Sequence, residues 1–282
     1  MEVIVAKTAG FCFGVKKAVD TAYEQINMGK KIYTLGPIIH NETVVKDLED
    51  KGATVIENID DLKNIKSGTV IIRSHGVPKN VYDLLEENHI DYVDTTCPFV
   101  KRIHSIVSKA AEEGKTVVII GNAGHPEVEG IQGWAGEKSY VIESVEQAEK
   151  FDLPKETEIC LVSQTTFNHK KFEELVAIFE KKYYYINVAK TICNATEHSQ
   201  KEAAEIASKA DVMIVIGGAH SSNSRKLYEI CKKECDNTYF IQTLDDLSLD
   251  LSKPAEIVGI TAGASTPNNI LEEVQNYVRH NF

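Results

Sequence analysis

Three cysteines have the residue type and the surroundings of metal ligands. Cys12, Cys97 and Cys193 each follow a strand-like stretch and precede a helix-like one, and 85 and 96 residues separate them. This spacing excludes the close C-x-x-C pairs of a zinc ribbon or a two-cluster ferredoxin. A fold that brings the three thiolates together could hold zinc with an open fourth position, or an iron–sulfur cluster in which one iron lacks a protein thiolate. Buried, inert thiols are the alternative.

The other cysteines carry weaker signals. Cys160 lies inside the strand-like EICLVS and is read as a core residue. Cys231 and Cys235 share a helical face in CKKEC, but no third ligand lies near them in the sequence. Six cysteines in 282 residues are too few for a disulfide scaffold, so thiols or metal ligands in a reducing compartment are expected.

Polar side chains gather where other strand-like stretches end. They are His40, His75, His125, Thr165, Thr166, Ser221, Ser222, Asn223 and Ser265. Taken singly, a histidine of this kind is more often packed or exposed, and a serine or threonine is more often a helix N-cap. Together, imidazoles, hydroxyls, an amide and helix N-termini suit a phosphate or diphosphate. The absence of a P-loop lysine, and of the third glycine in IGGAHSSNS, argues against an ordinary nucleotide site.

One carboxylate lies among these donors. Glu127 follows His125 by two residues in GHPEVEG. A carboxylate repels a phosphate, so its place there is better explained as that of a proton donor, above all if burial raises its pKa. The alternative is that Glu127 or Glu129 caps the following helix.

The elements that must position these residues recur three times. After each cysteine comes a helix-like pattern, then a strand ending in glycine, a second helix, a further strand and a last helix. The first helices are predicted at 14–28, 99–113 and 196–209. Counting nine residues back from a matching position in the last helix makes His75, Thr165 and Ser265 equivalent. This α/β alternation predicts parallel sheets covered by helices, with functional loops at the carboxyl ends of the strands.

A fourth strand leads into each cysteine, and two copies contain the tetrapeptide VAKT, at residues 5–8 and 188–191. The last repeat has no such strand of its own, so the N-terminal strand is expected to complete its sheet and to close a ring with an approximate three-fold axis. The three predicted α/β domains are 9–96, 97–192 and 193–282, the last completed by 1–8. An unrelated run of α/β elements with a chance match is the alternative.

Composition limits the class of protein. The chain is 43% hydrophobic and 26% charged, with a formal charge of −11, which argues against nucleic-acid binding. It has no apolar run of about 18 residues and no signal-peptide pattern, so a cytoplasmic protein without a membrane span is expected. Any anionic substrate must be held by local donors, because the field of the whole protein repels it.

The motifs together resemble a known family, the 4-hydroxy-3-methylbut-2-enyl diphosphate reductases of the non-mevalonate isoprenoid pathway. The resemblance covers essentially the full chain. It rests on GFCFGV, GPIIHN, RSHGV, DTTCP, GHPEV, SQTT, ICNAT, SSNS and GAST, which stand in the family's order. It implies three α/β units around a central iron–sulfur cluster.

The resemblance also implies residue roles. Cys12, Cys97 and Cys193 would hold one 4Fe-4S cluster whose apical iron stays open for the substrate hydroxyl. The diphosphate would be bound by His40, His75, Ser221, Ser222, Asn223 and Ser265. His125 and Thr166 would help to enclose the substrate, and Glu127 and Thr165 would deliver protons. Reductive loss of the hydroxyl would then give isopentenyl diphosphate and dimethylallyl diphosphate.

The electrons would come from outside, one at a time, from a donor such as ferredoxin or flavodoxin, and a monomer is expected. The sequence does not locate the basic patch on which such a donor would dock. Two other classes stay open at this point. A three-cysteine cluster hydro-lyase would remove water without an electron donor, and an iron–sulfur or zinc sensor would not depend on Glu127.

Overall fold

The computed structural model describes residues 1–183, 185–248 and 255–281. Its strands form three four-stranded sheets in which the paired strands are parallel. The chain divides into two compact units. The terminal unit (Met1–Lys16, Ile39–Asp47 and Asn194–Phe282) contains one sheet, and the middle unit (Lys17–Ile38 and Leu48–Cys193) contains two. Within the described ranges, no helix is long and apolar enough to cross a membrane.

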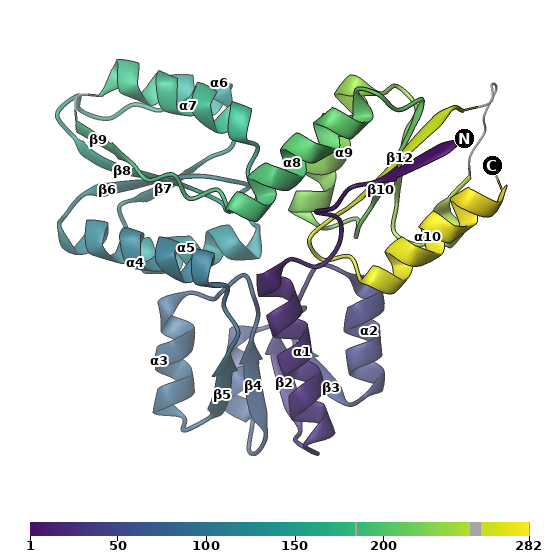
Figure 1. Ribbon diagram of the computed structural model, residues 1–282. Helices are drawn as coiled ribbons and strands as arrows, with labels where there is room; N and C mark the ends of the chain where they lie inside the picture. Colours follow the sequence, from purple (N-terminus) through teal and green to yellow (C-terminus); the bar gives the residue numbers. More distant parts are fainter. Residues whose placement is uncertain (184, 249–254, 282) are drawn as a thin grey trace. The chain divides into compact units, whose positions relative to one another are not determined.

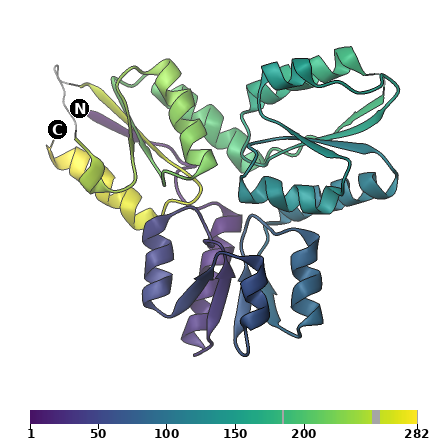
Figure 2. The same ribbon diagram turned by 180° about the vertical axis from the view of Figure 1, so that it is seen from behind.

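The sheet of the terminal unit has the strand order β11-β10-β12-β1. Its strands are β1 (Glu2–Val5), β10 (Val212–Ile216), β11 (Thr238–Ile241) and β12 (Ile257–Ala262). Helices α8 (Asn194–Ala207) and α9 (Ser222–Glu234) cover one face, and α10 (Asn268–Asn281) covers the other (Figures 1 and 2). The one-turn helix η2 (Leu244–Asp246) follows β11.

The side chains of β10 alternate between these two helical layers. Ile214 packs in one apolar cluster with Val274 of α10, whereas Met213 packs in another with Leu227 of α9. A central parallel strand is buried on both faces, and this explains the uninterrupted apolar sequence VMIVI.

The first sheet of the middle unit has the order β3-β2-β4-β5. Its strands are β2 (Ile32–Leu35), β3 (Ala53–Ile56), β4 (Thr69–Ile72) and β5 (Asp91–Asp94). One apolar cluster joins Val70 of β4 to Val81 and Leu85 of α3 (Lys79–Glu87) and to Leu62 of the 3-10 helix η1 (Ile59–Asn64). Helices α1 (Phe13–Asn27) and α2 (Glu42–Asp50) begin in the terminal unit and end in the middle unit.

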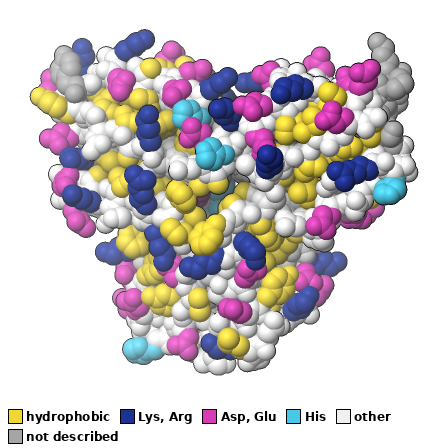
Figure 3. Space-filling view, viewed as in Figure 1, with side chains coloured by type: hydrophobic (Ala, Val, Ile, Leu, Met, Phe, Trp, Pro, Cys, Tyr) yellow, Lys and Arg dark blue, Asp and Glu magenta, His cyan; other side chains and the backbone are white. Residues whose placement is uncertain are grey.

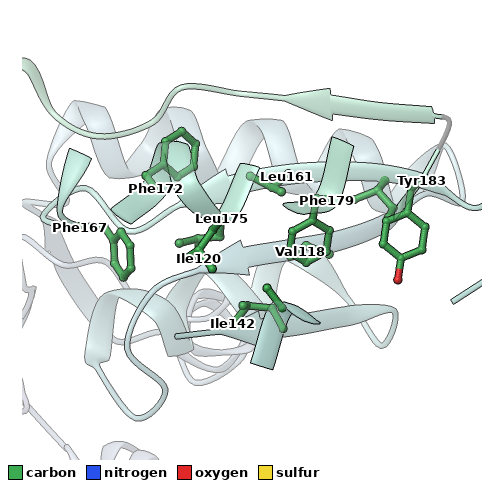
Figure 4. Close-up of a cluster of buried hydrophobic side chains, with 11 residues drawn as sticks. Val118, Ile120, Ile142, Leu161, Phe167, Phe172, Leu175, Phe179 and Tyr183 are labelled. Carbon is green, nitrogen blue, oxygen red and sulfur yellow. The ribbon is translucent and has the colours of Figure 1, made fainter. Parts of the chain in front are cut away.

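The second sheet of the middle unit has the order β7-β6-β8-β9. Its strands are β6 (Thr116–Ile120), β7 (Ser139–Ile142), β8 (Glu158–Ser163) and β9 (Tyr185–Val188). In Figure 1, α4 (Pro98–Glu112) and α5 (Pro126–Ala135) lie on one face, and α6 (Val145–Lys150) and α7 (His169–Lys182) lie on the other. Figure 4 shows the cluster on the α7 side, where Phe172, Leu175 and Phe179 pack against Val118 and Leu161.

The N-terminal strand takes the same place in its sheet that β5 and β9 take in theirs. It pairs with β12, with Val5 opposite Ile260, so the prediction that an N-terminal strand completes the last sheet is confirmed for Glu2–Val5. The predicted first helices also form, at residues 13–27, 98–112 and 194–207. The division into three domains at 96/97 and 192/193 stays a prediction, because the two sheets of the middle unit belong to one compact body.

Candidate active site

Each cysteine predicted as a ligand follows the edge strand of its own sheet. The connection from strand to cysteine has six residues before Cys12 (6–11), two before Cys97 (95–96) and four before Cys193 (189–192). In every case the cysteine amide donates to the carbonyl of the second residue past the neighbouring strand. The acceptors are Ala264 (3.2 Å) for Cys12, Ser74 (3.0 Å) for Cys97 and Thr165 (3.0 Å) for Cys193. The three cysteines therefore hold equivalent backbone positions despite different connection lengths.

A helix starts directly after each of these cysteines. Phe13 begins α1, Pro98 begins α4 with Cys97 as its N-cap, and Asn194 begins α8. Each cysteine therefore lies at the positive end of a helix dipole. All three side chains are half-buried. Soft, half-buried sulfur donors at three equivalent positions fit an iron–sulfur cluster better than a hard-metal site.

The two VAKT segments, which lead to Cys12 and Cys193, are fixed by different hydrogen-bond partners. Thr191 is buried, and its hydroxyl accepts from the Ser163 amide at 2.7 Å and donates to the Ser163 carbonyl at 2.8 Å. Thr8 is exposed, and its amide (2.9 Å) and hydroxyl (2.6 Å) donate to the carboxylate of Glu202 on α8. The Lys7 amide donates to the other Glu202 oxygen at 2.9 Å. Although burial opposes it, this set of donors holds the pKa of Glu202 below its usual value.

Glu127 is a buried carboxyl in the middle unit, only 2% exposed. The Thr165 amide donates to its Oε1 at 2.6 Å, and the Thr165 hydroxyl lies 2.7 Å from its Oε2. The same threonine accepts the Cys193 amide through its carbonyl. One residue thus links the predicted proton donor to a predicted ligand.

The N-terminus of α5 is capped by a histidine and not by a glutamate. The imidazole Nδ1 of His125 accepts the Glu127 amide at 3.1 Å, which leaves the carboxyl of Glu127 for Thr165. Helix capping as the alternative role of Glu127 is therefore wrong. Because Nδ1 is the acceptor, a neutral His125 carries its proton on Nε2. Its ring meets the ring of His75 edge-on, with centroids 5.6 Å apart.

Gly76 keeps the His75 turn in place. Its backbone φ of +73° is rarely adopted by residues other than glycine, and an added Cβ would lie 2.6 Å from the imidazole of His104. The His104 ring is buried and stacks on Trp134, with centroids 5.3 Å apart. Burial lowers the pKa of His104 to about 4, so the ring is neutral at pH 7.

The expected equivalence of Thr165 with His75 and Ser265 is wrong by one residue. The same turn follows the third strand of each sheet, closed by amide-to-carbonyl bonds from Gly76 to Arg73, Phe167 to Gln164 and Thr266 to Gly263. In this alignment Thr166 matches His75 and Ser265, whereas Thr165 matches Ser74 and Ala264. Counting back from the helix failed because the connection from His75 to α3 is one residue longer than the other two.

In the terminal unit, the start of α9 carries the Ser-Ser-Asn group. Ser221 is the N-cap, and its hydroxyl accepts from the amide and hydroxyl of Ser224 at 3.3 and 2.9 Å. The Oδ1 of Asn223 is buried without a hydrogen-bond partner among the described residues. The Nζ of Lys226 donates to the Ser222 hydroxyl at 3.1 Å, and this lysine is only 9% exposed. Lys226 was not among the predicted site residues, although its spacing of four residues from Ser222 on a helix was an available signal.

His40 and Ser265 also lie together in the terminal unit. The Ser265 hydroxyl donates to the His40 carbonyl at 3.1 Å. A Cβ added to Gly218 would lie 2.5 Å from that same carbonyl oxygen. Residue 218 must therefore be glycine for the two backbone segments to pack this closely. The start of α9, Ser265 and His40 therefore form one group of predicted diphosphate donors.

The remaining cysteines are core residues. Cys231 and Cys235 are buried, and their sulfurs lie 3.9 and 3.4 Å from the carbonyls of Ala203 and Ala210. Burial raises the pKa of Cys231 to about 12, which is unsuited to a thiolate ligand. Cys160 belongs to the apolar cluster between β8 and α4.

Comparison with known proteins decides the family. The family model described as "LytB protein" matches residues 3–279. The chain belongs to the LytB family. LytB proteins are iron–sulfur enzymes, and the thiol chemistry of Cys12, Cys97 and Cys193 agrees with that membership.

LytB relatives match over nearly their full length. A protein of Caldanaerobacter subterraneus is 48% identical over 276 residues, which cover 97% of this chain and 95% of the relative. A protein of Clostridioides difficile is 42% identical over 281 residues, covering 99% and 100%. Both are named 4-hydroxy-3-methylbut-2-enyl diphosphate reductase.

Two solved LytB structures resemble the fold. The Plasmodium falciparum E-1-hydroxy-2-methyl-but-2-enyl-4-diphosphate reductase superposes with a TM-score of 0.91 at 28% identity, covering 98% of this chain and 87% of that one. A second structure, of an (E)-4-hydroxy-3-methyl-but-2-enyl diphosphate reductase, gives a TM-score of 0.70 at 39% identity, covering 99% and 100%. The predicted α/β fold class is confirmed.

Proposed function

We propose that this chain reduces (E)-4-hydroxy-3-methylbut-2-enyl diphosphate to isopentenyl diphosphate and dimethylallyl diphosphate, the last step of the non-mevalonate isoprenoid pathway. The oxidoreductase class has the support of full-length relatives at 42–48% identity. The observation that carries the residue-level proposal is the bonding of buried Glu127 to Thr165, whose carbonyl also accepts the Cys193 amide.

Cys12, Cys97 and Cys193 are the proposed ligands of one 4Fe-4S cluster. This assignment requires the two compact units to bring Cys12 to the two cysteines of the middle unit. When bound, the cluster supplies electrons and an open iron that acts as a Lewis acid on the substrate hydroxyl. The equivalent amide bonds of the three cysteines, and the helix that starts after each, support the assignment.

Glu127 and Thr165 are the proposed proton donors. Loss of the allylic hydroxyl breaks one C–O bond and consumes two electrons and two protons, one of which leaves in water and one of which is added to carbon. A protonated Glu127 can pass a proton to the Thr165 hydroxyl, which can pass its own proton on to the leaving oxygen. Hydroxide thereby leaves as water, and the 2.7 Å separation of the two side chains suits this transfer.

The diphosphate is proposed to bind to His40, His75, Ser221, Ser222, Asn223 and Ser265, with His125 and Thr166 enclosing the substrate. The first turn of α9 adds backbone N–H groups and the positive end of its dipole. Asn223 can offer its amide nitrogen to the anion, and buried Lys226 places a positive charge behind Ser222. Uncharged donors with one cation suit a polyanion that the net charge of −11 repels at long range.

The electron donor is proposed to be an external one-electron carrier such as ferredoxin or flavodoxin. A monomer in the cytoplasm and the division into domains 9–96, 97–192 and 193–282 with 1–8 are also proposed. Monomeric mass by light scattering in dilute buffer tests the oligomeric state.

The deciding experiment is anaerobic purification followed by an absorption spectrum, an iron and sulfide analysis, and an assay with reduced viologen and the allylic diphosphate. A brown protein with about four irons per chain that forms both products supports the proposal. A colourless, zinc-containing protein would sink it. Turnover without any reductant would instead favour a hydro-lyase.

Serine variants of two proposed ligands and one core cysteine separate metal ligands from core thiols. Cys97→Ser and Cys193→Ser are expected to lose iron and activity together, because serine is a poor ligand for this cluster. Cys160→Ser provides a control with a buried cysteine and keeps its iron. Equal iron loss in all three variants would indicate unfolding rather than ligation.

A further inference from the structure

Helix α1 exposes an aromatic ring next to a predicted cluster ligand. Phe13 follows Cys12 directly and is 73% exposed, more than any other large hydrophobic side chain among the described residues. Single exposed hydrophobic residues are common on proteins and need no explanation by themselves. The residues around Phe13 indicate whether it belongs to a binding surface.

Two lysines share the helical face of Phe13. Lys16 and Lys17 lie three and four residues further along α1, and both are exposed, whereas Ala18 and Ala22 are fully buried. We call Phe13, Lys16 and Lys17 the Phe13 face. Figure 3 shows hydrophobic side chains beside lysines and arginines over the start of α1.

This face is locally positive on a negative protein. Residues 3–20 contain three lysines and one acidic residue, the exposed Asp20, whereas the whole chain carries a formal charge of −11. The N-terminus of α1 adds the positive end of its dipole. An acidic partner is repelled by the protein as a whole, so a local positive area with an apolar centre is where it can approach.

We propose that the Phe13 face is the docking surface for an acidic one-electron carrier protein. The proposal rests on the function proposed above, which requires two electrons from outside. Each carrier would give up one electron and leave oxidised. Two such electrons and two protons would balance the loss of the hydroxyl as water. The face adjoins Cys12 in the chain, so a carrier seated there lies close to a cluster ligand. An aromatic centre with a charged rim suits a small, transient interface.

The test compares a protein donor with a small one. The holoprotein without substrate is mixed anaerobically with reduced flavodoxin or with reduced methyl viologen, and bleaching of the cluster is followed by stopped-flow absorbance. For Lys16→Glu/Lys17→Glu, the second-order rate constant with flavodoxin is expected to fall roughly 10-fold or more at low salt, because steering of that size is lost. Phe13→Ala is expected to lower it less. The rate with viologen is expected not to fall in either variant.

A matched control changes the same charge elsewhere on the same segment. Lys30→Glu/Lys31→Glu reverses two exposed lysines just past the other end of α1, about 20 Å away along the helix axis. Its rate with flavodoxin is expected to stay within about twofold of the parent rate, since charges further apart than a Debye length are screened. The proposal is overturned if both charge-reversal variants lose the same fraction of the rate constant with flavodoxin. It is also overturned if Lys16→Glu/Lys17→Glu keeps the parent rate constant.

Failure of docking and failure of the proposed function give different results. If flavodoxin reduces the cluster at a rate that depends on the Phe13 face, but neither donor supports consumption of the allylic diphosphate, the function fails and the docking surface stands. Carbodiimide cross-linking to flavodoxin gives a readout that needs no turnover. Cross-links at Lys16 or Lys17 support the face, and cross-links only at other lysines contradict it.

Discussion

The two compact units carry different kinds of predicted site residue. The middle unit carries the buried carboxyl of Glu127, held by Thr165, and the paired imidazoles of His75 and His125. The terminal unit carries hydroxyls and an amide at the start of α9, and none of its predicted site residues is acidic. We therefore expect the middle unit to deliver protons through Glu127 and the terminal unit to supply most of the diphosphate donors, with His75 of the middle unit added to them.

This separation matters for a reaction that protonates one end of a molecule while binding a polyanion at the other. A carboxyl among the diphosphate donors would repel the substrate, and a lysine or arginine beside Glu127 would favour the ionised carboxylate, which cannot donate a proton. Substitutions on the two units should therefore affect different kinetic constants.

The largest effect is expected for Glu127→Gln. Glutamine keeps the size of the side chain and can still accept the Thr165 amide, but it has no proton to give. We expect kcat to fall about 10²- to 10⁴-fold with KM and iron content unchanged. Steady-state kinetics with reduced viologen measure this. Glu129→Gln, an exposed position on the same helix, is the matched control and should keep full activity.

Thr165 comes next, because its hydroxyl lies beside the carboxyl of Glu127 while its backbone holds Cys193. Thr165→Val removes the hydroxyl and leaves both backbone hydrogen bonds. A loss of about 10- to 100-fold in kcat is expected, the equivalent of one buried hydrogen bond. Thr165→Ser should restore most of the activity. If valine and serine variants were equally active, the hydroxyl would have no part in proton delivery.

Asn223→Ala tests the anion-binding half of the comparison. Loss of a hydrogen bond to a charged group is expected to raise KM by about 10-fold or more, with kcat changed only a few-fold. Inhibition by inorganic pyrophosphate should weaken in parallel, whereas Glu127→Gln should leave that inhibition unchanged. A fall in kcat with unchanged KM would place Asn223 among the proton-handling residues and would break the comparison.

The smallest effect is expected for the hydrogen bonds that fix the connections leading to Cys12 and Cys193. Glu202→Gln should destabilise the terminal unit by about 1 kcal/mol at pH 7, because a half-exposed carboxylate that accepts three hydrogen bonds becomes an amide. The folded-state pKa of Glu202 is lowered from 4.5, so its stabilisation is present above about pH 4.5 and is lost as pH falls through the folded-state pKa.

Urea unfolding of the parent and Glu202→Gln proteins between pH 3.5 and 7 measures this difference. The difference between the two stabilities should shrink as the pH falls below about 4.5. Thr191→Val removes the corresponding bonds in the middle unit, where no carboxylate takes part, so its destabilisation should not change with pH in that range. If the difference in unfolding free energy between the parent and Glu202→Gln stayed constant with pH, the charge of Glu202 would not contribute to stability.

The repeats made much of the fold predictable. Three strand–cysteine–helix junctions, and one repeat without its fourth strand, were enough to predict that β1 pairs with β12. Such predictions depend on hydrophobic periodicity and element order, which are local properties of the sequence. The placement of Thr166 was missed because counting residues across a turn fails where one connection has an extra residue.

Side-chain partners were harder to predict. Glu127 and Thr165 are 38 residues apart, and Glu202 and Thr8 are 194 apart. Nothing local distinguishes Glu202 from the other glutamates of α8, because its role depends on which loop packs against that turn of the helix. His125 as the cap of α5 was missed for a related reason, since serine, threonine, aspartate and asparagine are the usual side chains at that position.

The shared anchor of the three cysteines has a consequence for how such a chain can change over time. Connections of two, four and six residues all bring the cysteine amide to the second residue past the neighbouring strand. The length of the connection is therefore free to drift by insertion and deletion, while the anchoring bond is kept. The longest connection, residues 6–11, shows that extra residues beside one proposed ligand are compatible with the same anchoring bond.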